Sequence, residues 1–281
     1  MSYAIRFPMQ VAEGLEKTWR TDELLASNSR AAYFDIQYSI IQRVEPLKDI
    51  LEKFLNKGDL VLEAGCGSCR WVDFLKKQGY RPIGVDISTK ILHIIRQLEP
   101  SMHLSAGNVF SLPFQTGIFD AVFSSYVLEH FTQGPIPALK EAKRVLKPGG
   151  LLIFIVPFNN LLRVVLFNRL LDLACYYYPL GSSKFAFSEY RFNRKECRNF
   201  LLGAGFEQIQ FFPDECLADW NKGITTDYRN LKFYWPWLPD LQAPYQLPRW
   251  WGWINSLLLK AYSWSSCGGI ICIARKSKEE K

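Results

Sequence analysis

Residues with the potential for ligand chemistry gather after two short apolar runs. Glu63 follows Leu60-Val61-Leu62 and leads into Gly65 and Gly67 in the segment Glu-Ala-Gly-Cys-Gly. Glycine lets the backbone approach a ligand closely, because it has no Cβ. Asp86 ends the second run, 19 residues after Gly67, a distance typical of an acid that binds ribose hydroxyls. These residues predict a cofactor site at the carboxyl ends of neighbouring strands.

Two cofactor classes use this arrangement, and Glu63 favours one of them. A nicotinamide site has the pattern Gly-x-Gly-x-x-Gly, whereas the last position here is Arg70. A nicotinamide site also needs no acid at Glu63. A carboxylate there suits a ligand that carries positive charge, such as the amino and sulfonium groups of S-adenosylmethionine. The glycines alone are compatible with both classes.

The elements that must position these residues alternate between strand and helix. Apolar runs predict strands at 60–62, 82–86, 102–106, 119–124, 151–156, 206–212 and 269–274. Helical segments are expected at 72–78, 87–98 and 137–146, and from a capping box at Asn193 to about Leu202. The unbroken apolar run 151–156 is typical of a strand buried on both faces in a parallel sheet. The sequence therefore predicts an α/β fold, a doubly wound, Rossmann-like, mostly parallel sheet of seven strands with helices on both faces.

Five motifs in a fixed order make the chain similar to a known family. They are Glu-Ala-Gly-Cys-Gly at 63–67, Gly-Val-Asp-Ile-Ser at 84–88, Gly-Asn-Val-Phe-Ser-Leu-Pro-Phe at 107–114, Phe-Asp-Ala-Val-Phe-Ser-Ser-Tyr-Val-Leu-Glu-His at 119–130 and Arg-Val-Leu-Lys-Pro-Gly-Gly at 144–150. The series resembles class I S-adenosylmethionine-dependent methyltransferases, in the small-molecule, type 11-like branch that includes quinone-biosynthesis methyltransferases. The resemblance is continuous over residues 58–157 and returns weakly at 193–212 and 268–275.

The resemblance implies roles for individual residues. S-adenosylmethionine would be the cofactor and S-adenosylhomocysteine the product. Asp86 would hold the ribose and Ile87 would lie against the adenine, with Asn108 and Val109 at the adenine edge. The residues implied at the methionine end are Glu63, Gly65, Cys66, Gly67 and Ser125.

This chain departs from the family pattern at three positions. Cys69 stands where the family has Gly, and its small side chain is expected to preserve packing. Asn108 replaces the usual Asp, and its amide can still contact adenine. Tyr126 stands where some quinone-pathway relatives carry a Glu associated with metal binding, so no metal is expected. Cys66 and Cys69 form a lone CxxC without histidines at ligand spacing, which also argues against a metal or redox site.

The catalytic base is the least defined part of the site. Methyl transfer from a sulfonium mainly requires alignment, exclusion of water and sometimes a base. His130 is the leading candidate for that base, and a packing or capping histidine is the alternative. Glu129 is expected to form structural hydrogen bonds, and Tyr126 to point either into the pocket or into the core. Glu189 lies in a segment that could fold over the site.

Aromatic residues are concentrated in two segments that the motif series does not cover. The chain has 42 Phe, Tyr and Trp residues in 281, and segments 157–192 and 213–266 hold half of them. We therefore expect an N-terminal helical cover over 1–57 and a methyltransferase domain over 58–281, in which these two insertions form the substrate lid. The helix expected at 161–174 could pack on the domain, cover the site or contact a membrane. Five tryptophans are expected first in a core and second in an apolar pocket or a membrane-facing belt: Trp235, Trp237, Trp250, Trp251 and Trp253.

Charge and leader signals bear on partners and location. The net charge of +7 arises from short stretches and not from a long basic arm, which argues against nucleic acid as a partner. Arg191, Arg194, Lys195 and Arg198 have the spacing of one helical face, for which a solvated face is favoured over an anion site. The first residues lack a signal peptide, so a cytoplasmic protein is expected, with peripheral membrane contact left open.

The sequence thus predicts a methyltransferase that transfers a methyl group to a small acceptor. This acceptor is expected to be apolar or aromatic, and lipid-linked molecules are included. A sugar or polar metabolite is the alternative acceptor. A nicotinamide oxidoreductase and an inactive methyltransferase-like binding module are the alternative classes. The acceptor atom and the oligomeric state are not encoded in these patterns.

Overall fold

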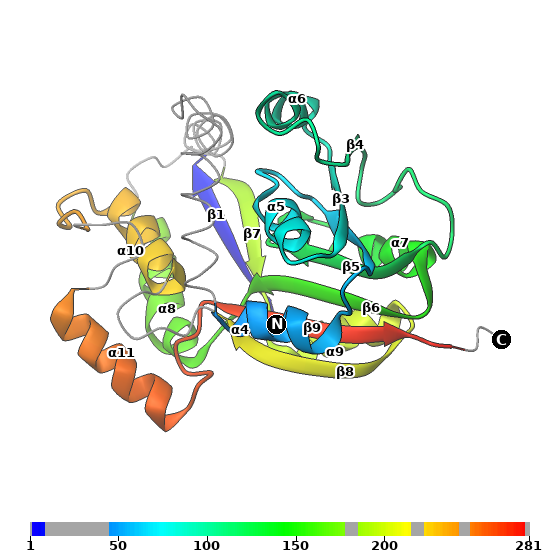
Figure 1. Cartoon of the computed structure of the whole chain (residues 1–281). Coiled ribbons are helices and arrows are strands. Elements are labelled where there is room, and N and C mark those ends of the chain that lie inside the picture. Colours follow the sequence, from blue (N-terminus) through cyan, green and yellow to red (C-terminus); the bar gives the residue numbers. More distant parts are fainter. Residues whose placement is uncertain (1, 9–44, 178–184, 215–221, 242–247, 279–281) are drawn as a thin grey trace.

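A seven-stranded sheet forms the centre of the computed structural model, which describes residues 2–8, 45–177, 185–214, 222–241 and 248–278 (Figure 1). The strand order is β4-β3-β2-β5-β6-β9-β8. Among the described strands of this sheet, β9 alone runs antiparallel to its neighbours β6 and β8. The strands are β2 (Leu60–Ala64), β3 (Arg81–Asp86), β4 (Leu104–Ala106), β5 (Phe119–Ser125), β6 (Leu146–Pro157), β8 (Phe206–Asp214) and β9 (Gly269–Lys276). The predicted fold is confirmed.

Helices cover both faces of this sheet. The residues of α4 (Glu45–Phe54) and α5 (Arg70–Lys77) pack with alternate residues of the strands, among them Val61 and Phe123. The other face, with Leu62 and Val122, packs against α7 (Ile136–Val145) and α9 (Arg194–Gly203). Helix α6 (Thr89–Leu98) packs on α5 through Val72. The predicted capping box starts α9, because the Asn193 side chain accepts from the Glu196 amide and the Glu196 side chain accepts from the Asn193 amide.

The order of the strands creates the place where a ligand can bind. From strand β2 the chain proceeds to β3 and β4 on one side, and then returns to β5 and β6 on the other side. The connections after β2 and β5 therefore diverge at the carboxyl ends of these two neighbours. Open α/β sheets bind their ligands at such a switch point.

The aromatic segments and the N-terminal strand form a second, smaller unit, which we call the insertion unit. Strand β1 (Tyr3–Pro8) pairs antiparallel with β7 (Phe185–Arg191). Four further elements belong to it: the π-helical turn η2 (Arg163–Phe167), α8 (Asn168–Tyr176), α10 (Lys222–Tyr234) and α11 (Arg249–Ala261). Ile5, Phe167, Leu171, Ile224 and Leu231 share its core. Figure 1 shows the unit on the left, with α11 in orange at its outer end.

The N-terminal segment differs from the helical cover expected over 1–57. Its first described element is strand β1, whose partner β7 lies more than 170 residues away in the chain. Within the expected cover, α4 is the helix that the structure describes, and residues 9–44 lie outside the described residues.

Two predictions about the insertions are wrong in part. Arg191 lies on strand β7 and is fully buried, whereas Arg194, Lys195 and Arg198 lie exposed on α9. The reason is that a strand, not a helix, precedes Asn193, so the four cations do not share a helical face. Trp250 and Trp253 are 65% and 67% exposed and do not belong to a core.

Candidate functional site

The loops after β2 and β5 meet at the switch point. The Gly65 and Cys66 amides both donate to the Val85 carbonyl at 2.8 Å, which ties the first loop to the end of β3. Gly65 has φ +81°, and a Cβ there would lie 2.5 Å from a methyl carbon of Val127, in the turn after β5. Because both the positive φ and the lack of space require glycine, this position fixes how the two loops pack.

Glu63 lies at this junction with one carboxylate oxygen unsatisfied. The residue is 2% exposed, and Oε2 has no hydrogen-bond partner among the described residues. Burial raises the pKa of the Glu63 carboxyl to about 8, against the opposing effects of the Arg70 charge and the Val72 amide. A buried polar atom without a partner is costly, so this oxygen suits a ligand that donates to it.

Ser125 offers a second unsatisfied polar atom on the same side of the sheet. Its Oγ is buried and without a partner in the described part of the chain. Glu63 pairs with Phe123 in the ladder between β2 and β5. Because side chains alternate along a strand, Ser125 and Glu63 face the same helix layer. The two residues therefore fit the amino end of a cationic ligand such as S-adenosylmethionine.

Asp86 organises the neighbouring loops with its carboxylate. Oδ2 accepts a hydrogen bond from the Gly67 amide at 2.8 Å, and Oδ1 accepts one from the Ser88 amide at 2.8 Å. Each carboxylate oxygen keeps a further acceptor site, which could take a ribose hydroxyl. The next side chain, Ile87, is 67% exposed, so it offers an apolar surface beside Asp86.

Asn108 and Val109 lie next to the end of β4 and have partners of their own. The Asn108 side-chain oxygen accepts from the Phe110 amide at 3.0 Å, so it closes a local turn. Val109 packs partly buried against the main core. The structure thus places these two residues at the expected edge of the site, with the Asn108 side chain exposed.

Cys69 is conformationally unusual. It has φ 57° and ψ 21° at the start of α5, in the left-handed region that favours glycine. Glycine adopts this conformation without strain, so Cys69 carries a backbone cost that glycine at this position would avoid. The Cys69 Sγ lies 3.5 Å from the Cys66 Sγ, and both residues are buried.

Tyr126 directly follows β5 and also has a positive φ of 55°. Its hydroxyl donates to Asp214 Oδ2 at 3.2 Å, across the ends of the strands. A Cβ at Gly269 would collide with this hydroxyl, so the contact requires glycine there. Strained non-glycine residues occur often at functional sites. No sequence signal marked Asp214, because it lies at the end of an ordinary amphipathic strand.

His130 is held by the insertion unit. Its Nδ1 lies 2.8 Å from the Ser188 carbonyl oxygen of β7. Because a carbonyl only accepts, Nδ1 carries the proton. In this tautomer of the neutral ring, Nε2 is the nitrogen that can accept a proton. Nε2 lies 3.8 Å from the carboxylate of Glu129, which is buried. Glu189, the next residue of β7, forms an ion pair with Arg191 at 3.8 Å.

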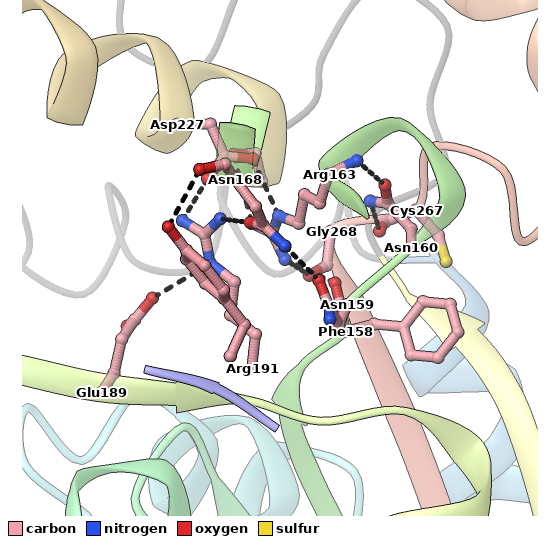
Figure 2. Close-up of polar contacts among 12 residues, drawn as sticks. Phe158, Asn159, Asn160, Arg163, Asn168, Glu189, Arg191, Asp227, Cys267 and Gly268 are labelled. Carbon is pink, nitrogen blue, oxygen red and sulfur yellow. Dashed lines mark hydrogen bonds and ion pairs between the residues drawn. The ribbon is translucent and has the colours of Figure 1, made fainter. Parts of the chain in front are cut away.

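A buried cluster of charges joins the insertion unit to the sheet, as Figure 2 shows. Arg163 donates to Asp227 Oδ2 at 2.7 Å and to the carbonyls of Phe158 and Gly268 at 2.7 and 2.9 Å. Arg191 donates to the other oxygen of Asp227. Burial lowers the pKa of Arg191, and the charge of Asp227 opposes this shift. Sequence reasoning missed this cluster; the only signal was Arg163 within an otherwise apolar run.

Comparisons with known proteins agree with this arrangement. Residues 62–154 match the family model described as a methyltransferase domain. An uncharacterised protein of Methanocaldococcus jannaschii is 32% identical over 143 residues, 50% of this chain and 59% of that protein. A malonyl-[acyl-carrier protein] O-methyltransferase of Serratia marcescens is 30% identical over 112 residues, 38% of this chain and 44% of that enzyme. A demethylmenaquinone methyltransferase of Staphylococcus saprophyticus is 33% identical over 108 residues, 36% of this chain and 46% of that enzyme.

Solved structures share the fold over a larger part of the chain. A SAM-dependent methyltransferase from Methanosarcina mazei has a TM-score of 0.53 and 18% identity, covering 82% of this chain and 98% of the other. The [4+2]-cyclase SpnF has a TM-score of 0.52 and 21% identity, covering 83% of this chain and 81% of the other. The chain spans about half the length of the curated relatives it matches.

The strand order and the glycine loop define the class, a Rossmann-like methyltransferase fold. Residues 62–154 of the chain match a methyltransferase domain, and the resemblance found in the sequence is confirmed.

Proposed function

We propose that this protein is an S-adenosylmethionine-dependent methyltransferase that acts on a small acceptor. The observation that carries the proposal is the pair of unsatisfied buried atoms, Glu63 Oε2 and Ser125 Oγ, beside a glycine loop tied to Asp86. A nicotinamide has no ammonium group for a buried carboxylate, since its carboxamide donor is neutral. The arrangement therefore favours a cofactor with a cationic amino acid end.

The proposed cofactor site has an amino acid end and a nucleoside end. Asp86 would accept from the ribose hydroxyls, Ile87 would lie against the adenine, and Asn108 and Val109 would border it. When bound, the cofactor supplies an activated methyl group, and S-adenosylhomocysteine is the product. The residues proposed for the amino acid end are Glu63, Gly65, Cys66, Gly67 and Ser125.

We assign the chain's own part in the reaction to alignment, exclusion of water and removal of a proton. His130 would accept the proton of the acceptor at Nε2, since the Ser188 carbonyl fixes the proton on Nδ1. The domain over 58–281 would present the cofactor, and the insertions at 157–192 and 213–266 would close the acceptor side.

The acceptor is proposed to be apolar or aromatic, with lipid-linked molecules included, and a sugar or polar metabolite is the second candidate. The aromatic content of the insertions supports the first candidate. The name of one relative fits it as well, since it is described as a demethylmenaquinone methyltransferase, whereas another is named for a malonyl-[acyl-carrier protein], whose malonyl group is polar. Nucleic acid is not a proposed partner, and the proposed location is the cytoplasm, with contact at a membrane surface.

A binding module or an enzyme of another reaction class is the competing function. The match to a protein described as a [4+2]-cyclase shows that this fold serves more than methyl transfer. Titration calorimetry of the full chain with S-adenosylmethionine, S-adenosylhomocysteine, NAD and NADP separates these classes. Binding of NAD or NADP alone would refute the proposal.

Transfer activity and the acceptor need a second experiment. Cell extract fractions, incubated with the protein and methyl-labelled S-adenosylmethionine, should yield a labelled small molecule that mass spectrometry can identify. With that acceptor, His130→Gln should lower kcat about 10²-fold, the usual size of a general-base contribution, with little change in KM. A chain that binds the cofactor but labels nothing in any fraction would point to the binding module.

A further inference from the structure

Helix α11 turns its apolar side outward. Trp250 and Trp253 are 65% and 67% exposed, and Leu257 is 47% exposed. Their spacing of three and four residues places them on one side of the helix. The polar residue Asn255 instead points inward, where it is 1% exposed and accepts from the Ser266 hydroxyl at 2.6 Å. A surface helix of a protein that meets only water has the opposite arrangement.

The turn η2 and the residue before its start add to this surface. Leu161, Val164 and Val165 are 59%, 45% and 66% exposed. The two elements are tied together, because the amide of Leu162 donates to the carbonyl of Ser265 at 3.0 Å, just after α11. Trp251 of α11 packs in the same core as Phe167 of η2. We call the six exposed residues the apolar face: Leu161, Val164, Val165, Trp250, Trp253 and Leu257.

The two segments that carry the apolar face contain basic residues and no acidic ones, and Asp172 and Asp240 lie just outside them. Segments 156–171 and 241–268 contain no Asp or Glu. Arg169, Arg249 and Lys260 are exposed within them, and the whole chain carries a net charge of +7. Apolar side chains bordered by cations match the two layers of a bilayer surface, the acyl chains and the anionic headgroups. Tryptophan is the residue that this interface favours most clearly.

The length of α11 decides how it would meet a bilayer. Its 13 residues extend about 20 Å, which is shorter than the hydrocarbon core of about 30 Å. In the described part of the chain, no helix has the length and apolarity needed to cross a membrane. The helix would therefore lie along the surface, with its tryptophans at the level of the headgroups.

We propose that the apolar face docks on the surface of an anionic lipid bilayer. This docking does not depend on methyl transfer. If the proposed function also holds, docking brings the acceptor side of the site to the lipid surface, because β7 of the same unit contacts His130. A lipid-linked acceptor could then reach the site without crossing water.

Vesicle flotation with the full chain tests this proposal. The probes are vesicles of phosphatidylcholine alone and of phosphatidylcholine mixed with phosphatidylglycerol. The wild type should float with the anionic vesicles, and the double variant Trp250→Ser/Trp253→Ser should bind them at least about tenfold more weakly, which corresponds to about 1.4 kcal/mol. Arg249→Gln/Lys260→Gln should lose binding to the anionic vesicles and respond less to salt.

Leu202→Ser provides the matched control, because Leu202 is 56% exposed on α9, away from the insertion unit. This variant should float like the wild type. All variants should keep the unfolding temperature and the S-adenosylmethionine affinity of the wild type, which separates failure of docking from failure of the proposed function. Equal flotation of the tryptophan variant, or no flotation of the wild type, would overturn the proposal. A dimer of the wild type that the tryptophan variant dissociates, seen by light scattering, would also overturn it in favour of a second copy as the occupant.

Discussion

The switch point of the sheet and the insertion unit both bury charged side chains, but they satisfy them in different ways. In the insertion unit, Asp227 receives hydrogen bonds from two arginines, and Arg163 also bonds to the ends of β6 and β9. At the switch point, Glu63 keeps a buried oxygen without a partner in the described residues. The first arrangement gives both oxygens of its carboxylate a partner, although Arg191 Nε has only an ion pair with Glu189 at 3.8 Å in place of a hydrogen bond. The second leaves a carboxylate oxygen without a partner, which supports the proposal that a ligand binds at the switch point.

The largest effect should be a loss of stability when the ion pairs of Asp227 are removed. Asp227→Ala leaves two buried arginines without their shared carboxylate, and loss of one partner of a buried ion pair costs about 3–5 kcal/mol. Urea unfolding should show this loss in the free energy of unfolding. Asp240→Ala is the control, because Asp240 pairs with Lys232 at the exposed surface and should cost little. Equal effects of the two substitutions would refute the difference drawn between the two regions.

The second largest effect should appear in cofactor affinity. Asp86→Ala removes the acceptors for the ribose and for the Gly67 and Ser88 amides, so we expect about 10²-fold weaker binding of S-adenosylmethionine by calorimetry. Asp86→Asn keeps the shape of the side chain and should lose less affinity for S-adenosylmethionine than Asp86→Ala. Asp49→Ala, on the exposed side of α4, is the control and should bind like the wild type. An unchanged affinity in Asp86→Ala would remove Asp86 from the site.

Glu63 should make cofactor binding depend on pH. Since burial raises the pKa of this carboxyl to about 8, the free protein holds a proton there at neutral pH. A cationic amino group prefers the ionised carboxylate, so affinity for S-adenosylmethionine should rise about tenfold between about pH 6 and about pH 7, below the range in which the ligand's own amino group loses its proton. Glu63→Gln should bind more weakly, and its affinity should not change with pH in this range. The same pH dependence in both proteins would contradict the assignment.

Glu63 also links stability to pH in the protein without cofactor. Its folded-state pKa lies above the unfolded value, so the folded protein binds more protons between about pH 4.5 and about pH 8. The free energy of unfolding should therefore fall as the pH rises through this range. Saturating S-adenosylmethionine should make the free energy of unfolding fall less with rising pH. In Glu63→Gln, the contribution of this carboxyl to the pH dependence should be absent.

The smallest effect should come from Cys69. Cys69→Val places a β-branched residue in the left-handed region and should lower the free energy of unfolding by about 1–2 kcal/mol. Cys69→Gly relieves the backbone strain at this position and should leave the free energy of unfolding close to that of the wild type. Thermal unfolding with and without cofactor measures both. A more stable Val variant would show that packing, and not conformation, decides the residue at this position.

The sheet was predictable, and with it the positions of the proposed cofactor residues, because local rules determine them. Alternating apolar runs and turn residues predict the strands, and Glu63, Gly65 and Asp86 lie within a few residues of strand ends that must be neighbours. The insertion unit followed no such rule. Arg191 pairs with Tyr3 in the ladder between β1 and β7, and Asp227 is 36 residues away from Arg191 in the chain. Nothing in the local sequence indicates which distant charge a buried arginine will meet, so Arg191 was assigned to a helical surface.

The contact between His130 and Ser188 has a consequence for how the acceptor side can change. The insertion unit reaches the histidine through a main-chain carbonyl, which every amino acid at position 188 would supply. Substitutions along β7 can therefore reshape the pocket while the tautomer of the histidine stays the same. If His130 takes the proton as we propose, such an arrangement lets relatives diverge in the molecules they accept without losing that group.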